Sequence, residues 1–253
     1  MSDKRANKDK LPLVSILRTC DYTSCSPALV YSSDSEKRYY LSILDQPLKL
    51  KWHIEFSTQV AMTTTKTLLT FDEYLAYDDG TDTRYELVDG ELVAMPPESP
   101  ENNTIAKKVF VVLLQHFALE LVSHKDTEVE VSGRLARCRI PDLLVHTEES
   151  AAALEGATRA TITRDMPPPA LVVEVVSPGE TNRQRDYRYK HTEYAARAIA
   201  EYWIVDPEQR QVTVCYWVEG QYEDTVFRGE DAIRSTVVPK LELKVNQLFV
   251  VGD

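Results

Sequence analysis

The run of residues 171–176 constrains this chain most, because an acidic residue interrupts an otherwise apolar segment. It reads Leu-Val-Val-Glu-Val-Val, with Glu174 in fourth place. A strand of this composition is usually buried on both faces of a sheet. A carboxylate buried there without a partner loses its hydration at a large cost in free energy. Glu174 therefore either meets a partner inside the fold or lies at a strand end where it reaches water.

A second acid has the same setting. Asp142 lies in residues 140–145, which read Ile-Pro-Asp-Leu-Leu-Val. Taken alone, a Pro-Asp pair is most often part of a turn. Two acids that each stand in a hydrophobic strand instead indicate a shared ligand. A hard divalent cation is the simplest such ligand, because these cations prefer oxygen donors.

The composition limits the possible partners. The 253 residues carry 40 Asp and Glu against 29 Lys and Arg, a net charge of -11. This balance argues against a surface covered in positive charge, although it leaves room for a local basic groove. The longest apolar runs fall short of the roughly 18 residues that a membrane span needs, and residues 11–17 are too short for a signal peptide. We therefore expect a cytoplasmic protein without a membrane partner, whose four cysteines are free thiols.

Residues 1–61 differ from the rest of the chain. All eight glycines lie at or after Gly80, and residues 1–61 carry a net charge of +2 against -13 for the remainder. We predict a weakly structured N-terminal extension, followed by one domain over residues 62–253. One hypothesis is that Met62 is the natural start and that the extension is not translated. The alternative is an N-terminal element that docks on the domain through its apolar residues 41–52.

Strands and helices are mixed along residues 62–253, which predicts an α/β domain. Thr70 and Glu73 form a capping-box pattern that opens a short helix ending near residue 76. Asp89-Gly90 separates two strand-like segments, 85–88 and 91–95, as in a β-hairpin. The other predicted elements are helices over 105–122 and 182–198, strands over 128–131, 137–145, 171–176, 201–205, 211–218 and 221–227, and an irregular or briefly helical segment over 151–163.

The order Pro141-Asp142, then Glu174, outlines the PD-(D/E)xK nucleases, in which a lysine stands two residues after the second acid. This chain has Val176 at that position, and the nearest downstream lysine is Lys190. A lysine on a helix packed beside the strand can reach the same space, so we interpret Lys190 as the replacement. The alternative is a solvated lysine on the predicted helix 182–198.

Several stretches together resemble one family, the Uma2 or DUF820 endonucleases that are abundant in cyanobacteria. The resemblance covers about residues 62–250. It rests on the ordered set TFDEYL (70–75), YELVDGEL (85–92), PDL (141–143), LVVEVVSP (171–178), Arg185-Asp186, Lys190 and EYWIVDP (201–207). Many members have a histidine near position 102, where this chain has Asn102-Asn103, so no role of that histidine is carried over.

The resemblance implies an α/β fold with a restriction-endonuclease-like core: a central mixed β-sheet flanked by helices, with C-terminal β-hairpin additions. It implies a metal-dependent endonuclease that hydrolyses DNA phosphodiester bonds. Asp142 and Glu174 would hold Mg²⁺ or Mn²⁺, and Lys190 would orient or activate the attacking water. Glu86 is either a third metal ligand or a surface acid.

Basic residues flank both acids. Arg137 and Arg139 precede Asp142, and three more arginines follow Glu174, namely Arg183, Arg185 and Arg188. Such residues either contact DNA phosphates without reading bases or serve solubility alone. Two other functions remain open: a catalytically inactive member of the same fold that binds nucleic acid or protein, and another metal-dependent phosphodiesterase. A homodimer is also compatible with the sequence.

Overall fold

The computed structural model describes residues 29–31, 38–40, 68–135 and 137–249. The chain divides into two compact units, Met1–Thr64 and Thr65–Asp253. In the first unit, β1 (Leu29–Tyr31) and β2 (Arg38–Tyr40) form an antiparallel pair. The other predictions for residues 1–61, and the hypothesis about Met62, lie outside the described residues. Everything below concerns the second unit.

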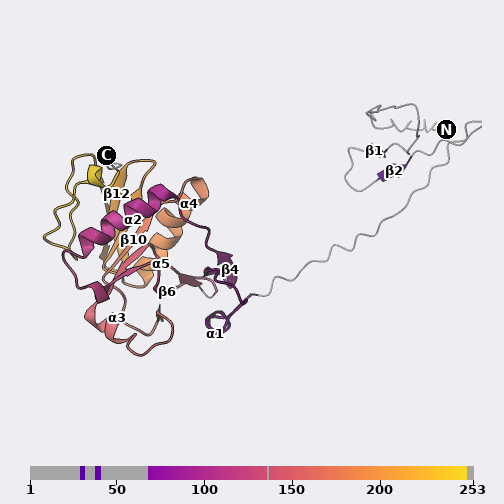
Figure 1. Cartoon of the computed structure of the whole chain (residues 1–253), viewed down its shortest axis with the longest axis horizontal. Coiled ribbons are helices and arrows are strands. Elements are labelled where there is room, and N and C mark those ends of the chain that lie inside the picture. Colours follow the sequence, from indigo (N-terminus) through magenta and orange to yellow (C-terminus); the bar gives the residue numbers. More distant parts are fainter. Residues whose placement is uncertain (1–28, 32–37, 41–67, 136, 250–253) are drawn as a thin grey trace, which may run out of the picture. The chain divides into compact units, whose positions relative to one another are not determined.

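The second unit contains two mixed sheets (Figure 1). The larger sheet has the spatial order β13-β12-β11-β10-β8-β5, and the smaller has the order β4-β3-β7-β6-β9. Neighbouring strands are antiparallel except for two parallel pairs, β10 with β11 and β6 with β9. The strands are β3 (Tyr85–Val88), β4 (Glu91–Ala94), β5 (Val122–His124), β6 (Glu128–Val131), β7 (Arg137–Arg139), β8 (Leu143–Val145), β9 (Thr161–Ile162), β10 (Leu171–Val175), β11 (Glu201–Asp206), β12 (Gln211–Val218) and β13 (Gln221–Arg228).

Helices accompany both sheets, so the predicted α/β class, with a mixed sheet flanked by helices, is confirmed. The prediction had one central sheet, and the described part of the domain has two. The helices are α1 (Phe71–Leu75), α2 (Pro100–Leu113), the 3₁₀ turn η1 (Leu119–Leu121), α3 (Glu148–Ala152), α4 (Glu180–Gln184), the π-helix η2 (Arg185–Lys190), α5 (His191–Ala196) and α6 (Val245–Phe249). Among the described helices, none combines the length and the apolar character needed to cross a bilayer.

The larger sheet separates two hydrophobic cores, because successive side chains of a strand point to opposite faces. Leu171, Val173 and Val175 of β10 pack into a core that includes residues of α2 and α6. Helix α2 crosses this face of the sheet in Figure 1. Val172 and Val176 belong to a second core, shared with residues of α5 and of the smaller sheet. Glu174 has the parity of Val172, so its side chain points into the layer between the larger sheet and α5.

Local sequence signals that rest on short-range chemistry are confirmed. Thr70 caps α1, where its hydroxyl accepts from the Glu73 amide and the Glu73 carboxylate accepts from the Thr70 amide. The turn between β3 and β4 has left-handed backbone at both central residues, with φ of 50° at Asp89 and 81° at Gly90. This geometry is that of a type I′ hairpin turn. The C-terminal hairpin β12–β13 is also present as predicted.

Three predicted elements have different bounds. The helix predicted over 105–122 starts at Pro100, behind the cap of Ser99, and ends at Leu113, and Val122 belongs to β5. The strand predicted over 137–145 is two strands in different sheets, because Pro141 has no amide hydrogen to continue a ladder. The helix predicted over 182–198 is interrupted by the π-helix η2.

Candidate active site

Glu174 lies at the centre of the larger sheet, on β10 between β8 and β11. It is 4% exposed and faces the helical segment formed by η2 and α5. The Tyr194 hydroxyl donates a 2.8 Å hydrogen bond to Glu174 Oε1, and the Lys190 ammonium lies 2.7 Å from the same oxygen. The buried acid predicted from the sequence is therefore partnered from the helix above it. In the described part of the chain its polar contacts are made by Oε1, which leaves Oε2 to bind a cation.

Asp142 lies beside Glu174 because of the strand register. Strands β8 and β10 are antiparallel with Leu143 opposite Val173, so one further residue places Asp142 opposite Glu174. Opposed residues of an antiparallel pair point to the same face. Asp142 is 7% exposed, and its Oδ2 accepts a 2.7 Å hydrogen bond from the amide of Val175. After the split at Pro141, β8 thus begins directly behind Asp142, the residue that lies opposite Glu174.

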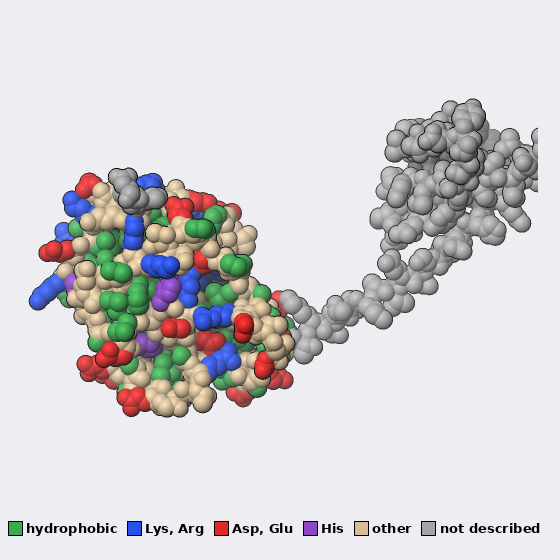
Figure 2. All heavy atoms as spheres, viewed as in Figure 1, with side chains coloured by type: hydrophobic (Ala, Val, Ile, Leu, Met, Phe, Trp, Pro, Cys, Tyr) green, Lys and Arg blue, Asp and Glu red, His purple; other side chains and the backbone are tan. Residues whose placement is uncertain are grey.

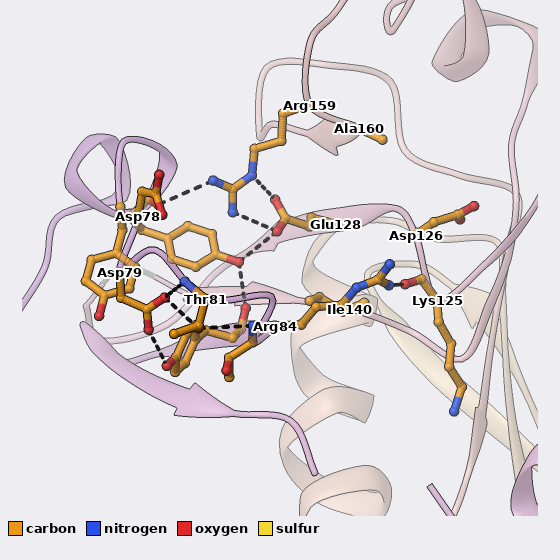
Figure 3. Close-up of a pocket in the computed structure, with 14 residues that line it drawn as sticks. Asp78, Asp79, Thr81, Arg84, Lys125, Asp126, Glu128, Ile140, Arg159 and Ala160 are labelled. Atoms are coloured by element: carbon orange, nitrogen blue, oxygen red, sulfur yellow. Dashed lines mark hydrogen bonds and ion pairs between the residues drawn. The ribbon is translucent and has the colours of Figure 1, made fainter. Parts of the chain in front are cut away.

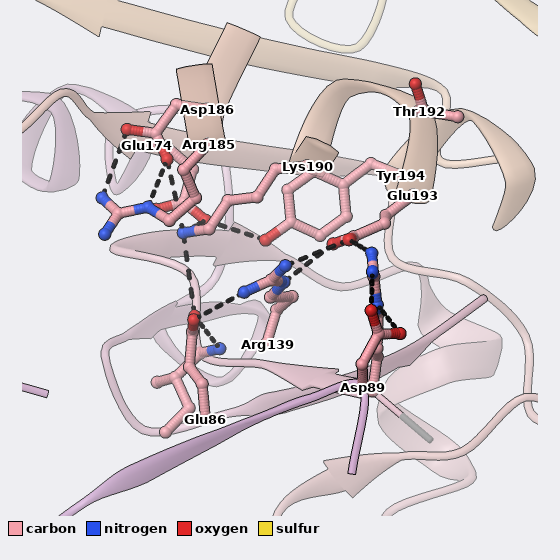
Figure 4. A network of polar contacts seen from close by, with 12 residues as sticks. Glu86, Asp89, Arg139, Glu174, Arg185, Asp186, Lys190, Thr192, Glu193 and Tyr194 are labelled. Carbon is pink, nitrogen blue, oxygen red and sulfur yellow. Dashed lines mark hydrogen bonds and ion pairs between the residues drawn. The ribbon is translucent and has the colours of Figure 1, made fainter. Parts of the chain in front are cut away.

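Lys190 reaches the acids from the last position of η2 (Figure 4). Its ammonium is 2.7 Å from Glu174 Oε1 and 3.7 Å from both Glu86 Oε1 and Asp186 Oδ1. The residue is 3% exposed, so it is not a solvated surface lysine. The structure therefore brings Lys190 to Glu174, the second acid of the PD-(D/E)xK pattern. It takes the place of the strand lysine, which is Val176 in this chain.

Glu86 is buried as well, at 5% exposure, and comes from β3 of the smaller sheet. Its Oε2 is 2.9 Å from the Arg139 guanidinium, and its Oε1 accepts a 3.2 Å hydrogen bond from the amide of Ile140. Arg139 also binds Glu193 of α5 through two nitrogens, at 2.7 and 3.0 Å. Glu86 is thus an interior acid that links the smaller sheet to Lys190.

The ion pairs around Lys190 form one network with an excess of negative charge. Among the described residues they join five carboxylates with four cations. The carboxylates are Glu86, Asp89, Glu174, Asp186 and Glu193, and the cations are Arg137, Arg139, Arg185 and Lys190. One proton on a carboxylate would make the network neutral.

The pKa shifts follow from this arrangement. Burial raises the pKa of Glu174 to about 7, against the opposing attraction of Lys190. Burial also disfavours the charged forms of Lys190 and Glu86, but their ionised partners outweigh it. The pKa of Lys190 is therefore raised, by Glu174, Glu86 and Asp186. The pKa of Glu86 is lowered, by Lys190 and Arg139. Lys190 therefore stays protonated at neutral pH, while Glu174 takes up a proton in the metal-free protein as the pH falls through about 7.

The five arginines singled out in the sequence have different environments. Arg137 binds Asp89 and Glu193, and Arg139 is 2% exposed and paired with Glu86 and Glu193. Arg183 binds Asp206, and Arg185 is half-buried against Asp186 at 3.0 Å. Arg188 is the exposed member of the five. Burial in ion pairs gives Arg139 a structural function inside the domain, so it cannot reach a phosphate on a surface-bound duplex.

Lys125 is a site residue that the sequence did not indicate. Its ammonium lies 3.0 Å from Asp142 Oδ1 and 3.7 Å from Glu98 Oε1. It follows β5, and its backbone is left-handed, with φ of 57°, a strained conformation for a residue other than glycine. A lysine after a short strand carries no sequence signal of its function. The fold reveals it, because β5 pairs with β8, the strand that begins directly after Asp142.

Two further residues become part of the site through the structure. Tyr194 of α5 donates its hydroxyl to Glu174. Asn102 is 3% exposed, and its side-chain amide donates to the carbonyl of Val176 at 3.2 Å and to Glu98 at 3.4 Å. Asn102 therefore ties the start of α2 to the end of the strand that carries Glu174.

A pocket of about 320 Å³ lies on the other side of Lys125 (Figure 3). Lys125 and Ile140 belong both to its wall and to the surroundings of the acids. The charged side chains of the pocket are of both signs, with Arg159 held by Glu128 at 2.8 Å. Acidic and basic side chains are also interspersed on the face of the domain seen in Figure 2. Neither surface is a continuous basic groove.

The chain is similar to known proteins over most of its length. A model of the Uma2 family, described as "Putative restriction endonuclease", matches residues 71–246. A crystal structure of a "putative nuclease belonging to DUF820" from Anabaena variabilis ATCC 29413 is 17% identical, with a TM-score of 0.53. The match covers 72% of this chain and 97% of that chain, and it shows the same fold. No curated protein matches significantly.

Proposed function

Because the chain belongs to the Uma2 family, we propose that it is an endonuclease that hydrolyses DNA phosphodiester bonds with a divalent metal, Mg²⁺ or Mn²⁺. The observation that carries the proposal is the meeting of three groups in one layer. Asp142, directly before β8, lies opposite Glu174 of β10 when the register is continued by one residue, and Lys190 lies 2.7 Å from Glu174. The oxygen donors of the two acids fit a hard cation.

Asp142 and Glu174 would hold the metal, which when bound supplies an activated water and polarises the phosphoryl group. Lys190 stays protonated, so it acts as a hydrogen-bond donor and a positive charge rather than as a base. In this function it orients the attacking water and offsets the negative charge that develops on the phosphoryl oxygens. Tyr194 orients the Glu174 carboxylate through its hydroxyl.

Glu86 fits a positioning function better than that of a third ligand. Both of its oxygens already accept strong contacts, from Arg139 and from the Ile140 amide. Its charge attracts Lys190 from 3.7 Å and so holds the ammonium over the sheet. Contact with DNA phosphates would fall to Arg188, which is exposed, and to Arg185, whose side chain is 34% exposed. Both residues lie on η2, next to Lys190.

The test is cleavage of a supercoiled closed-circular plasmid by the purified protein, with Mg²⁺, Mn²⁺ or EDTA. A circular substrate has no ends, so nicking or linearisation reports an endonuclease. Asp142→Asn and Lys190→Met should both lose activity, whereas Glu155→Gln, at an exposed position, should retain it. Absence of cleavage with either metal would favour the inactive binding protein. Cleavage of simple phosphodiesters without cleavage of DNA would favour the other phosphodiesterase.

A further inference from the structure

A second group of possible metal ligands lies on the C-terminal hairpin, outside the acidic network. Cys215 of β12 stands directly opposite Asp224 of β13, and His191, the first residue of α5, lies over the pair. The possible ligand atoms of these three residues all lie within 4.8 Å of one another. In the described part of the chain, they are the group of His, Cys, Asp or Glu side chains that meets this criterion. The three donors come from three different elements, which the fold brings together.

We propose that His191, Cys215 and Asp224 form a binding site for a borderline-soft divalent metal, with Zn²⁺ as the preferred ion. A thiolate, an imidazole nitrogen and a carboxylate oxygen are the three ligand types that Zn²⁺ uses in proteins. Thiolate and imidazole also disfavour Mg²⁺, which prefers oxygen ligands. The site would therefore differ in metal preference from Asp142 and Glu174, and its existence does not depend on the nuclease function.

The spacing of the donors suits a tetrahedral ion. With bond lengths of about 2.0–2.3 Å, tetrahedral angles place ligand atoms about 3.3–3.8 Å apart. His191 Nε2 lies 2.9 Å from Asp224 Oδ1, so this pair needs to open by only about half an ångström. The His191 ring already points its Nε2 at Asp224, and its plane is fixed by an edge contact with Tyr222 at 5.2 Å between centroids.

In the metal-free protein, hydrogen bonds occupy the space that the ion would take. The Asp224 carboxylate is hydrogen-bonded both to His191 and to the Cys215 thiol. Burial raises the pKa of that thiol, so it is protonated at neutral pH. Binding would form bonds from the metal to sulfur, nitrogen and oxygen, and would release the thiol proton to solvent. A fourth ligand would be water, which can enter because His191 and Asp224 are partly exposed, at 23% and 44% of their side chains.

The location gives the site a structural consequence. His191 directly follows Lys190, and α5 starts at this residue. A metal that joins His191 to both strands of the hairpin would fix the start of α5 on the larger sheet. It would thereby restrict the segment that carries Lys190.

The experiment uses the full chain with Cys20 and Cys25 replaced by serine, so that a thiolate signal comes only from Cys138 or Cys215. Co²⁺ serves as the spectroscopic substitute for Zn²⁺. We expect one equivalent of Co²⁺ to give a cobalt–thiolate absorption band that Zn²⁺ then removes. Excess Zn²⁺ should raise the melting temperature by several degrees, because it binds the folded state.

Three variants separate this site from other sources of binding. Cys215→Ser should abolish the thiolate band, and Cys138→Ala, at the other buried thiol, should retain it. Asp224→Asn keeps the thiol and changes only an exposed side chain, so it tests the site without threatening the fold; it should weaken Zn²⁺ binding at least tenfold. Absence of the band in the parent protein, or Zn²⁺ binding that survives both Cys215→Ser and Asp224→Asn, would overturn the proposal.

Discussion

Replacing Glu174 by glutamine is expected to stabilise the metal-free protein at pH 8 and to change it little at pH 5. Glutamine has nearly the shape of a protonated glutamate but never carries the charge. Burial raises the pKa of Glu174 from 4.5 to about 7, so the folded state holds its proton more tightly than the unfolded state. The contribution of this group to stability is full below the unfolded pKa and is lost as the pH rises through about 7.

The size of the effect follows from the two pKa values. A difference of one pH unit between them corresponds to about 1.4 kcal/mol. The separation from 4.5 to about 7 therefore gives about 3 kcal/mol at pH 8 and less than about 1 kcal/mol at pH 5. For a domain of this size, about 1 kcal/mol changes the melting temperature by about 2–4 °C. Glu174→Gln should thus melt roughly 6–12 °C above the wild type at pH 8.

Thermal and urea unfolding in EDTA, at several pH values between 5 and 8, measures this difference. Glu155→Gln is the matched control, because Glu155 is exposed and its substitution should leave the pH dependence unchanged. If Glu174→Gln is less stable than the wild type at pH 8, the ion pair with Lys190 outweighs the cost of burying the carboxylate. An equal difference at pH 5 and pH 8 would also refute the reasoning, since the raised pKa would then not exist.

Three further predictions concern the residues around the acids. Lys125→Met should tighten Mn²⁺ binding several-fold in calorimetry, because it removes the cation that competes for Asp142, and an unchanged affinity would contradict that competition. Lys190→Met should abolish plasmid cleavage while Mn²⁺ still binds, and cleavage at the wild-type rate would refute the function of Lys190. The same substitution should lower the free energy of unfolding in urea by about 3 kcal/mol, because it leaves buried acids unpaired. Tyr194→Phe should cost about 1 kcal/mol and raise the pKa of Glu174 further, as followed by proton titration in EDTA, because a donor to the carboxylate is lost.

The sequence predicted the parts of the fold that depend on neighbours along the chain. The cap at Thr70 and the turn at Asp89-Gly90 rest on contacts within a few residues, so their signals are complete in the sequence. The split between β7 and β8 depends on tertiary context, because each strand pairs in a different sheet. The Pro141 signal was present, but the alternating residues 137–140 before it and the apolar residues 143–145 after it also fit one long strand.

The sequence predicted only those site residues that are charged and yet stand in an apolar strand, where burial is expected. An acid in an apolar strand demands a partner, which is why Glu174 and Asp142 stood out. Arg137 and Arg139 could not be separated from surface arginines, because their partners lie about 50 residues away, in Glu86, Asp89 and Glu193. The sequence also does not indicate that Lys125 belongs to the site, because the pairing of β5 with β8 brings it to Asp142.

The missing strand lysine and the π-helix belong to one arrangement. Val176 has the parity of Glu174, and it is 4% exposed in the core that also contains Tyr194. A lysine at that position would replace apolar packing, so the positive charge has to arrive from the helical layer over the same face. Regular α-helical spacing would place Arg183 and Tyr187 on one face with Lys190 and Tyr194.

The observed contacts divide that face into two. Arg183 and Tyr187 bind Asp206 at the end of β11, whereas Lys190 and Tyr194 bind Glu174 on β10. The wider turn of η2 changes the phase between α4 and α5, and π-turns of this kind occur often at functional sites. The helical segment thereby binds β11 through Arg183 and Tyr187, and it places Lys190 beside Glu174 on the neighbouring strand β10.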